Sequence, residues 1–385
     1  MSETPAFDEG SVSRHQRKRG ELQLQSDPTR AASSMLTCGV VRPRDGVGME
    51  SDTGIAVSGA ESPATSSHTA RSLLSGTHPV RIRSFGPLNP DKVFYVIYRQ
   101  KGPGFFSILT STLCHLDIAD RLGFVPVVDM EHFESHYNED HPIGGTRNSW
   151  EYYFRPVSPY SLDEVYQSRR VVFCDGGYPA GYPFWLTEAP ELQAAYRKHI
   201  SIDPGILDFV DRFEERELAG SSVLGVHFRG QEYRLAPDHP FPPTPRQMIA
   251  RAQALLAEGA YEKVFVVTEE QSYLDLFKRT FGNRVVCTEA YRTYETNAYG
   301  IYPRLDHSYL LGRDVLRDTL ILARCNALLC SGSNVSEFAQ FYNCGRYDVV
   351  SKVDNGVNVS NGVVAKGLWF VKSWLPQHLG GFPVE

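Results

Sequence analysis

Aromatic residues are almost missing from the first part of the chain. The sequence has 385 residues with 21 Phe, 20 Tyr and 4 Trp, yet Phe7 is the only aromatic residue before position 85. The same stretch is rich in Ser, Gly, Thr and charge, so it cannot bury enough apolar surface to offset the entropy lost on folding. We therefore expect residues 1–78 to be a disordered tail. Its basic run at 14–20 fits either a solvated charge run or a patch for nuclear import or nucleic acid.

Other features that the sequence lacks narrow the class of protein further. No stretch approaches the 18 or so apolar residues of a membrane span, and the N-terminus lacks the charged-then-apolar pattern of a signal peptide. Seven cysteines, an odd number without any CxxC pair, indicate reduced thiols and a cytoplasmic protein. A net charge of −6 gives no support for a nucleic-acid partner of the whole protein.

After residue 79 the sequence alternates between short apolar runs and amphipathic stretches. In the first half, apolar strands at 92–99 and 124–129 flank a glycine turn and a helix with apolar residues at helical spacing, closed by Gly123. A further strand is expected at 171–176. Strand, glycine turn, helix and strand make the βαβ unit of a parallel sheet.

The second half repeats this alternation more clearly. The expected strands are 221–229, 263–268, 284–288 and 326–330, and the expected helices are 246–259, 271–282, 310–325 and 333–345. The strands are continuously apolar, as in a sheet covered on both faces. The fold class is therefore α/β, with a first domain at 79–220 and a second, doubly wound domain at 221–385. Ligands of such sheets bind beyond the carboxyl ends of the strands.

Polar residues follow three strands of the second half. His227, Arg229 and Gly230 follow the first, where a guanidinium suits phosphate oxygens and a glycine admits a ligand close to the backbone. The alternative is a buried histidine beside a surface salt bridge. Thr268, Glu269 and Glu270 end the next strand, either as an acidic helix cap or as a ribose or base contact.

The third strand end is a Ser-Gly-Ser turn at the start of a helix. Ser331 and Ser333 lie in the turn, Asn334 and Ser336 in the first helical turn, and Asn334 has capping-box spacing with Glu337. Small hydroxyl residues and backbone N–H groups at a helix N-terminus form an anion site, although an ordinary helix cap would use the same residues.

Asp318 lies on the apolar stripe of the helix expected at 310–325. Leu311, Val315 and Leu322 share its stripe. An unpartnered carboxylate is costly there, so Asp318 needs a partner. That partner is either the Watson–Crick edge of guanine or a buried arginine of this chain.

Taken together, these residues resemble the donor half of the fucosyltransferases that use GDP-fucose, in the group of the α1,6-fucosyltransferases and protein O-fucosyltransferases. The resemblance covers residues 222–345 and, more loosely, the glycine turn at Gly102 and Gly104. It implies a GT-B fold of two Rossmann-like domains, with the donor held mainly by the second. It also implies an inverting, metal-independent transfer of fucose to a hydroxyl group of a glycan or protein.

The resemblance also implies roles for single residues. His227 and Asp318 would contact the guanine and ribose, Arg229 would hold the β-phosphate, and Ser333 with Asn334 and the helix start at Ser336 would support the phosphates. Gly230 departs from the pattern, because the α1,6 enzymes carry a second arginine there. Arg234 is one candidate to replace that charge.

The base that activates the acceptor has four carboxylate candidates. Glu232 and Asp238 follow the Arg229 strand, and Asp129 and Glu131 belong to the first half. Asp129-Met-Glu131 faintly resembles a pair of metal ligands but lacks the DxD form. The aromatic cluster at 150–154 either stacks on acceptor sugars or packs into a lid or core.

Three alternative functions stay open. The chain could use another nucleotide sugar, or it could be a catalytically inactive nucleotide- or glycan-binding protein, because the second arginine is missing. A dehydrogenase is disfavoured, because the glycine turn at 101–106 lacks the GxGxxG spacing.

Overall fold

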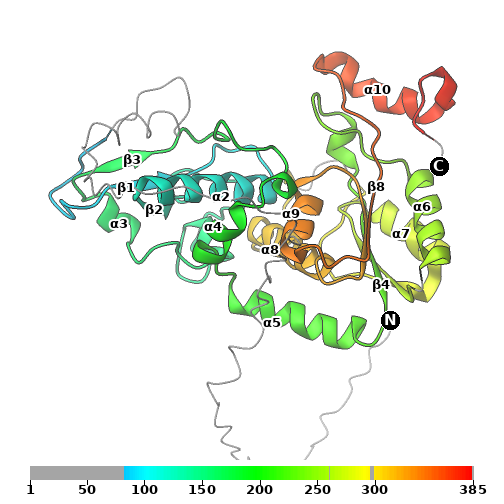
Figure 1. Cartoon of the computed structure of the whole chain (residues 1–385), viewed down its shortest axis with the longest axis horizontal. Helices are drawn as coiled ribbons and strands as arrows, with labels where there is room; N and C mark the ends of the chain where they lie inside the picture. Colours follow the sequence, from blue (N-terminus) through cyan, green and yellow to red (C-terminus); the bar gives the residue numbers. More distant parts are fainter. Residues whose placement is uncertain (1–81, 260, 295–298, 384–385) are drawn as a thin grey trace, which may run out of the picture. The chain divides into compact units, whose positions relative to one another are not determined.

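The computed structural model describes residues 82–383 except 260 and 295–298, and it describes no side chains for 231 and 232. The tail expected at 1–78 lies outside the described residues. The described chain contains two parallel sheets (Figure 1). The first has the order β2-β1-β3, from β1 (Phe94–Ile97), β2 (Val125–Val128) and β3 (Val171–Phe173). The second has the order β6-β5-β4-β7-β8, from β4 (Val223–His227), β5 (Lys263–Val267), β6 (Val285–Val286), β7 (Ala327–Cys330) and β8 (Val349–Lys352).

The first sheet is built on the expected βαβ unit. Helix α2 (Phe105–Leu122) connects β1 to β2, and Gly123 ends it in the left-handed conformation at φ 65°. A glycine adopts this conformation without the steric cost that a side chain adds. At the other end of the helix, the backbone N–H of Phe105 donates to the hydroxyl of Tyr137 at 2.8 Å.

The second sheet is covered on both faces. Alternate residues of its strands enter two different clusters: Val223, Phe265 and Leu328 join one, while Leu224 and Val266 join the other. Helices α8 (His307–Leu322) and α9 (Asn334–Asn343) pack on the first face, and α6 (Pro245–Glu258) and α7 (Gln271–Phe281) pack on the second. This explains why the strands read as continuous apolar runs.

Local sequence signals explain the ends of α6. Pro245 is the first residue of the helix, and Thr244 and Gln247 form a reciprocal capping box. Proline is tolerated at this position because its missing N–H has no partner inside the helix anyway. In β4, Gly225 leaves room for α8, because a Cβ there would lie 3.1 Å from both Cys325 and Leu322.

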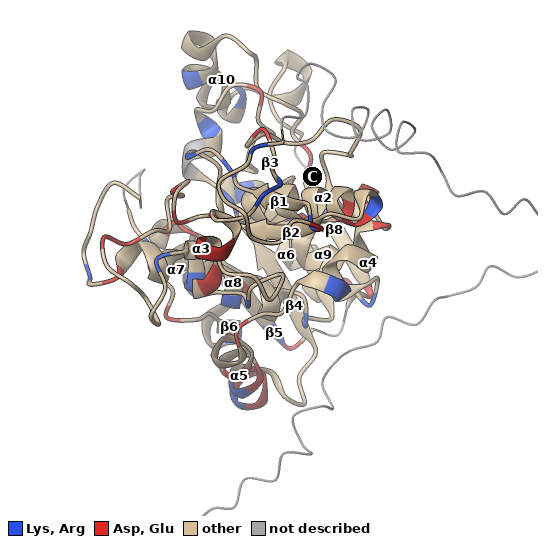
Figure 2. Cartoon of the chain, turned by 90° about the vertical axis from the view of Figure 1, so that its left-hand side faces the viewer, with Lys and Arg blue, Asp and Glu red and all other residues tan. Residues whose placement is uncertain are grey.

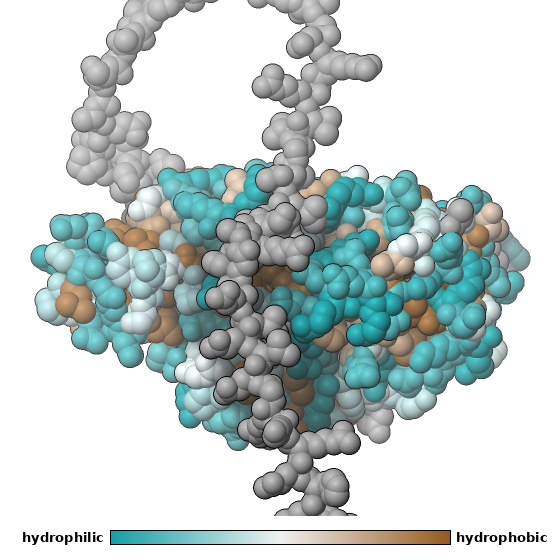
Figure 3. Space-filling model, turned by 90° about the horizontal axis from the view of Figure 1, so that it is seen from below, coloured by the Kyte–Doolittle hydropathy of each residue, from teal (hydrophilic) through white to brown (hydrophobic). Residues whose placement is uncertain are grey.

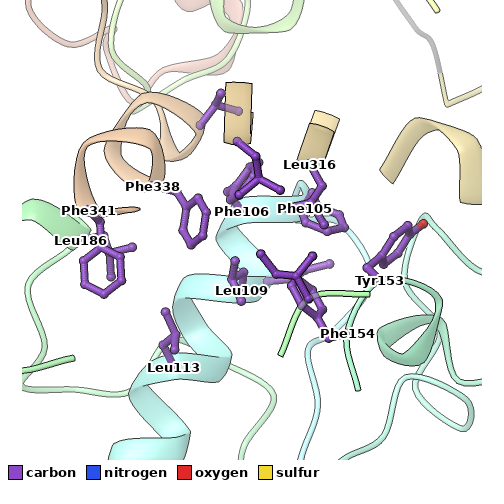
Figure 4. Close-up of a cluster of buried hydrophobic side chains, with 14 of the residues drawn as sticks. Phe105, Phe106, Leu109, Leu113, Tyr153, Phe154, Leu186, Leu316, Phe338 and Phe341 are labelled. Carbon is purple, nitrogen blue, oxygen red and sulfur yellow. The ribbon is translucent and has the colours of Figure 1, made fainter. Parts of the chain in front are cut away.

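One buried cluster contains residues from both sheets' helices. Figure 4 shows Phe106 of α2 beside Phe338 of α9, and their ring centroids are 4.8 Å apart. Tyr153 and Phe154 lie in the same cluster and are 2% and 3% exposed. The core interpretation of the aromatic residues at 150–154 is therefore confirmed, and sugar stacking by them is wrong, because their rings are buried.

The remaining elements connect or flank the sheets. They are α3 (Leu162–Val165), α4 (Leu192–His199), α5 (Pro204–Phe213), α10 (Gly362–Trp374), the 3-10 helices η1 (Ser149–Tyr152), η2 (Leu186–Glu188), η4 (Gln231–Arg234), η5 (Gly282–Arg284) and η6 (Gln377–Leu379), and the π-helical turn η3 (Glu214–Leu218). Helix α5 packs on α8, where Arg324 pairs with Asp211 and Glu214 at 2.7 and 2.6 Å. The domain boundary near 220 stays a prediction.

The described surface is polar and carries both signs of charge. Figure 2 shows acidic residues on α3 and basic residues on α10. Hydrophobic residues form separate patches on the face shown in Figure 3. Among the described residues, no helix combines the length and the apolar character that crossing a bilayer requires.

Candidate functional site at the carboxyl edge of the second sheet

The ends of four neighbouring strands form one edge of the second sheet. His227 at the end of β4 pairs in register with Val267 of β5, and Cys330 of β7 pairs with Lys352 of β8. Since the strands are parallel, the residues that follow them emerge on the same side. The three strand ends singled out from the sequence therefore lie along one edge, where α/β sheets bind their ligands.

His227 is buried at this edge and is 2% exposed. Burial lowers its pKa to about 4; Glu269 acts against this shift, and the charge of Arg229 contributes to it. The ring is thus neutral at pH 7. No group among the described residues accepts from or donates to its buried Nδ1 atom. A buried polar nitrogen without a partner is costly, which suits a side chain whose partner is a ligand.

Arg229 and Gly230 follow β4, and both contact Glu269, which follows the neighbouring strand β5. The Nε atom of Arg229 lies 3.6 Å from Oε1 of Glu269, and the backbone N–H of Gly230 donates to the same oxygen at 3.0 Å. The guanidinium also lies 4.8 Å from the ring centroid of Tyr233. The side chain of Arg229 is 24% exposed, and its Nε atom is buried.

The neighbourhood of Gly230 explains why no second arginine stands there. A Cβ atom at 230 would overlap the carboxylate of Glu270 and would lie 2.7 Å from Cε2 of Tyr273. Glu270 is in turn held by the guanidinium of Arg234, which also donates to the Tyr273 hydroxyl and lies 5.0 Å from the ring centroid of Trp369. The described contacts of Arg234 are thus with Glu270 and aromatic rings, and they do not support Arg234 as the substitute charge.

The end of β5 makes an incomplete helix cap. The hydroxyl of Thr268 accepts from the backbone N–H of Glu270 at 3.2 Å. Glu270 occupies the N-cap position of α7 but makes no side-chain cap. Its carboxylate pairs with Arg234 instead, so a simple capping role does not describe it.

The turn after β7 is closed by its own hydroxyl groups. Ser333 is the N-cap of α9 and accepts from the N–H of Val335 at 3.3 Å. The hydroxyl of Ser336 donates to the carbonyl oxygens of Ser331 and Ser333 at 2.7 and 2.9 Å. Asn334 is the first helical residue and does not cap the helix. The turn is therefore preorganised, with the N-terminus of α9 at the edge of the sheet.

Glu337 of α9 does not form the capping box that its spacing allows. Its carboxylate is buried, accepts from the hydroxyl of Thr187 and lies 3.4 Å from Nζ of Lys352. Lys352 ends β8, and its side chain is 41% exposed. The positive charge of Lys352 offsets the carboxylate in the first turn of α9, which would otherwise oppose an anion there.

Asp318 belongs to a second polar group beside the edge strand β6. Its Oδ1 accepts from the hydroxyl of Thr288 at 2.5 Å, and its Oδ2 lies 3.8 Å from Nη2 of Arg292. Burial raises the pKa of Asp318 to about 6, against the attraction of Arg292 and the hydrogen bond from Thr288. An arginine of this chain thus lies near Asp318 and partly offsets its charge.

Not all hydrogen-bond donors of Arg292 have a partner among the described residues. Its Nη1 donates to the carbonyl oxygens of Thr288 and Ala290, both at 2.9 Å. Its Nε and Nη2 atoms are buried and have no hydrogen-bond partner among the described residues. Asp318 and Arg292 together offer a carboxylate that can accept and guanidinium donors that no described residue uses, two strands away from His227.

The other expected site residues lie elsewhere. Asp238 is exposed, has φ 58° and accepts from the hydroxyl of Ser360 at 2.6 Å. Glu232 lies in η4, and no contact of its side chain is described. Gly102 and Gly104 precede α2 in the first half, and a Cβ at either would meet nothing within 4 Å. Asp129 is fully buried and accepts from Tyr166 and from the backbone of 131 and 132, so it closes a turn.

Three residues of the candidate site were not indicated by any sequence pattern. Arg292 lies in a loop without periodicity, Lys352 ends a strand that the pattern does not show, and Thr187 lies in the first half. Thr288 could have been found, since it is the last residue of the strand expected at 284–288. Among the described residues, no group of three or more His, Cys, Asp or Glu side chains is placed to hold a metal ion.

Two parallel sheets with helices packed against them, and a polar strand edge in the second, define an α/β protein. Solved structures of fucosyltransferases are similar to it. The fucosyltransferase NodZ from Bradyrhizobium matches 65% of this chain and 93% of its own, with 16% identity and a TM-score of 0.43. NodZ α-1,6-fucosyltransferase co-crystallised with GDP has 17% identity, 65% and 92% coverage and a TM-score of 0.42. POFUT1 in complex with GDP has 12% identity, 69% and 74% coverage and a TM-score of 0.34. No family model and no curated protein matches the sequence.

Proposed function

We propose that this protein is a glycosyltransferase that transfers fucose from GDP-fucose to a hydroxyl group, with inversion and without a metal ion. One observation carries the proposal. At the carboxyl edge of the second sheet, the partly exposed side chain of Arg229, a ring nitrogen of His227 without a hydrogen-bond partner among the described residues, and the N-terminus of α9 follow neighbouring strands. These groups suit a nucleoside diphosphate.

The chemistry requires stabilisation of a departing diphosphate. The bond from the acceptor oxygen to C1 of the sugar forms as the bond from C1 to the β-phosphate oxygen breaks, and GDP leaves with the electron pair. Arg229 and the N–H groups of α9 stabilise the developing charge. The acceptor proton passes to a base, for which Glu232 and Asp238 stay predictions.

The assignment of guanine and the assignment of fucose depend on different observations. Asp318 presents a buried carboxylate that can accept from the N1–H and N2–H groups of guanine, and the adjacent Arg292 has donors for O6. Fucose is assigned from the resemblance of the motif set to enzymes that use GDP-fucose. The cytoplasmic location also stays a prediction, from the cysteine content.

Turnover with purified protein tests the proposal. GDP release from GDP-fucose is measured in EDTA with pooled glycan and protein acceptors, for the wild type and for Arg229→Ala. We expect release that depends on an acceptor and on Arg229. An inactive protein that still binds GDP would instead be a nucleotide-binding protein, and release from a different nucleotide sugar would change the donor.

A further inference from the structure

Two adjacent aromatic residues, Phe184 and Trp185, lie in the segment between β3 and η2. Their ring centroids are 4.7 Å apart and their planes are at 77°, an edge-to-face arrangement. Phe184 is 60% exposed, and Trp185 is partly exposed. A large aromatic ring left in water beside a second ring is a candidate contact surface for a ligand.

The two rings lie in a segment that is anchored to the buried core. Leu186, the next residue, is 1% exposed and lies against Phe341 of α9 in the buried cluster (Figure 4). Thr187 then donates its hydroxyl to the buried carboxylate of Glu337. The two rings therefore stand on a segment fixed to α9 immediately after them.

The pair lies beside the turn that is proposed to hold the donor phosphates. A Cβ atom at Gly332, in the middle of that turn, would be 3.6 Å from Cζ2 of Trp185. On the neighbouring strand, Nζ of Lys352 lies 5.2 Å from the ring centroid of Trp185. The aromatic pair thus borders the donor site on the side of β7 and β8.

We propose that Phe184 and Trp185 form the platform on which a pyranose ring of a saccharide acceptor stacks. This inference rests on the proposed function and assigns its acceptor class. The C–H groups on one face of a pyranose carry slight positive charge, which suits the negative face of an aromatic ring. Sugar hydroxyls need polar partners nearby, and Lys352 is a half-exposed donor beside the ring. The aromatic residues at 150–154 cannot serve, because they are buried.

The test compares these rings with two exposed aromatic residues elsewhere. The variants are Phe184→Ala and Trp185→Ala, and the matched controls are Phe370→Ala and Trp374→Ala on α10, where the rings are 45% and 90% exposed. The full chain, saturated with GDP, is applied to a printed array of mono- and oligosaccharides. GDP affinity is measured separately by calorimetry. Transfer from GDP-fucose is then assayed on each glycan that binds.

We expect the wild type and both controls to bind the same glycans. Phe184→Ala and Trp185→Ala should each weaken that binding by about tenfold, with GDP affinity within about twofold of the wild type. Phe184→Ala keeps the test valid if the Trp185 variant folds poorly, since Phe184 is largely exposed.

The failures of the two proposals are distinguishable. Glycan binding or transfer that survives both substitutions overturns the platform, and so does transfer to a folded protein without binding to any printed glycan. Glycan binding that depends on the two rings, in a protein that does not bind GDP, supports the platform and overturns the donor site.

Discussion

Replacing Asp318 by Asn should stabilise the protein while weakening nucleotide binding. The carboxylate is buried between Thr288 and Arg292, and its pKa is raised to about 6, compared with the ordinary value of 3.8. Asparagine has nearly the shape of the protonated acid and can still accept the hydrogen bond from Thr288. The variant therefore avoids only the cost of holding an ionised carboxylate in this site.

The magnitude follows from proton linkage. Because the folded pKa is raised, Asp318 binds its proton more tightly in the folded chain than in the unfolded chain, so the contribution of Asp318 to wild-type stability falls as pH rises from about 4 to about 6. The loss at pH 7 is about 3 kcal/mol. Asp318→Asn lacks this loss, so it should melt on the order of 5 °C higher than the wild type at pH 7. Near pH 4 the two proteins should melt together.

Thermal unfolding followed by fluorescence between pH 4 and pH 8 measures this difference, and calorimetry with GDP measures binding. Asp314→Asn is the matched control, one turn earlier on α8. Its carboxylate lies 2.8 Å from Arg304 and 3.2 Å from Arg313, so removing its charge should destabilise the protein at pH 7. A variant at 318 that melts lower than the wild type at pH 7, or a difference that does not change with pH, would refute the reasoning.

Three further predictions concern the end of β4. Arg229→Ala should reduce transfer at least about a hundredfold and leave the melting temperature within a few degrees, and a folded variant with wild-type turnover would contradict this assignment. Gly230→Ala should displace Glu270 from Arg234 and cost about 1–3 kcal/mol in thermal melts, whereas Gly104→Ala, which meets open space, should cost little. The contribution of His227 to stability should fall as pH drops from about 6.5 towards 4, because its folded pKa is lowered to about 4, and it opposes the contribution of Asp318 in this range. His227→Gln should lose this part of the pH dependence, and a difference from the wild type that does not change with pH would argue against a buried neutral ring.

Local patterns in the sequence identify much of the fold. Neighbouring residues determine these features, and a sequence displays such residues directly. They are the C-cap at Gly123, the proline-initiated helix at Pro245 and the seven strands predicted in the two halves. The strand β8 and the helix α10 are harder to recognise. β8 is exposed at three of its four residues, and α10 is apolar around most of its circumference and contains Gly367, so neither has the expected periodicity.

Local sequence patterns cannot predict which side chains from different strands and loops become partners. The sequence shows that Asp318 needs a partner, but Arg292 is 26 residues away in an irregular loop, where spacing gives no guide. The absence of a second arginine at Gly230 is visible in the sequence, while its cause, the carboxylate of Glu270, becomes evident only when β4 and β5 are paired. The aromatic residues at 150–154 and at 184–185 have similar composition, and burial alone separates them.

The most direct test of the donor site is calorimetric titration of the purified protein, without added metal, with GDP, UDP, ADP and GDP-fucose. We expect GDP and GDP-fucose to bind in preference to the other two nucleotides, and we expect Arg229→Ala to abolish that binding. Equal affinity for the three nucleoside diphosphates, or binding of GDP that survives Arg229→Ala, would contradict a guanine nucleotide site at the carboxyl edge of the second sheet.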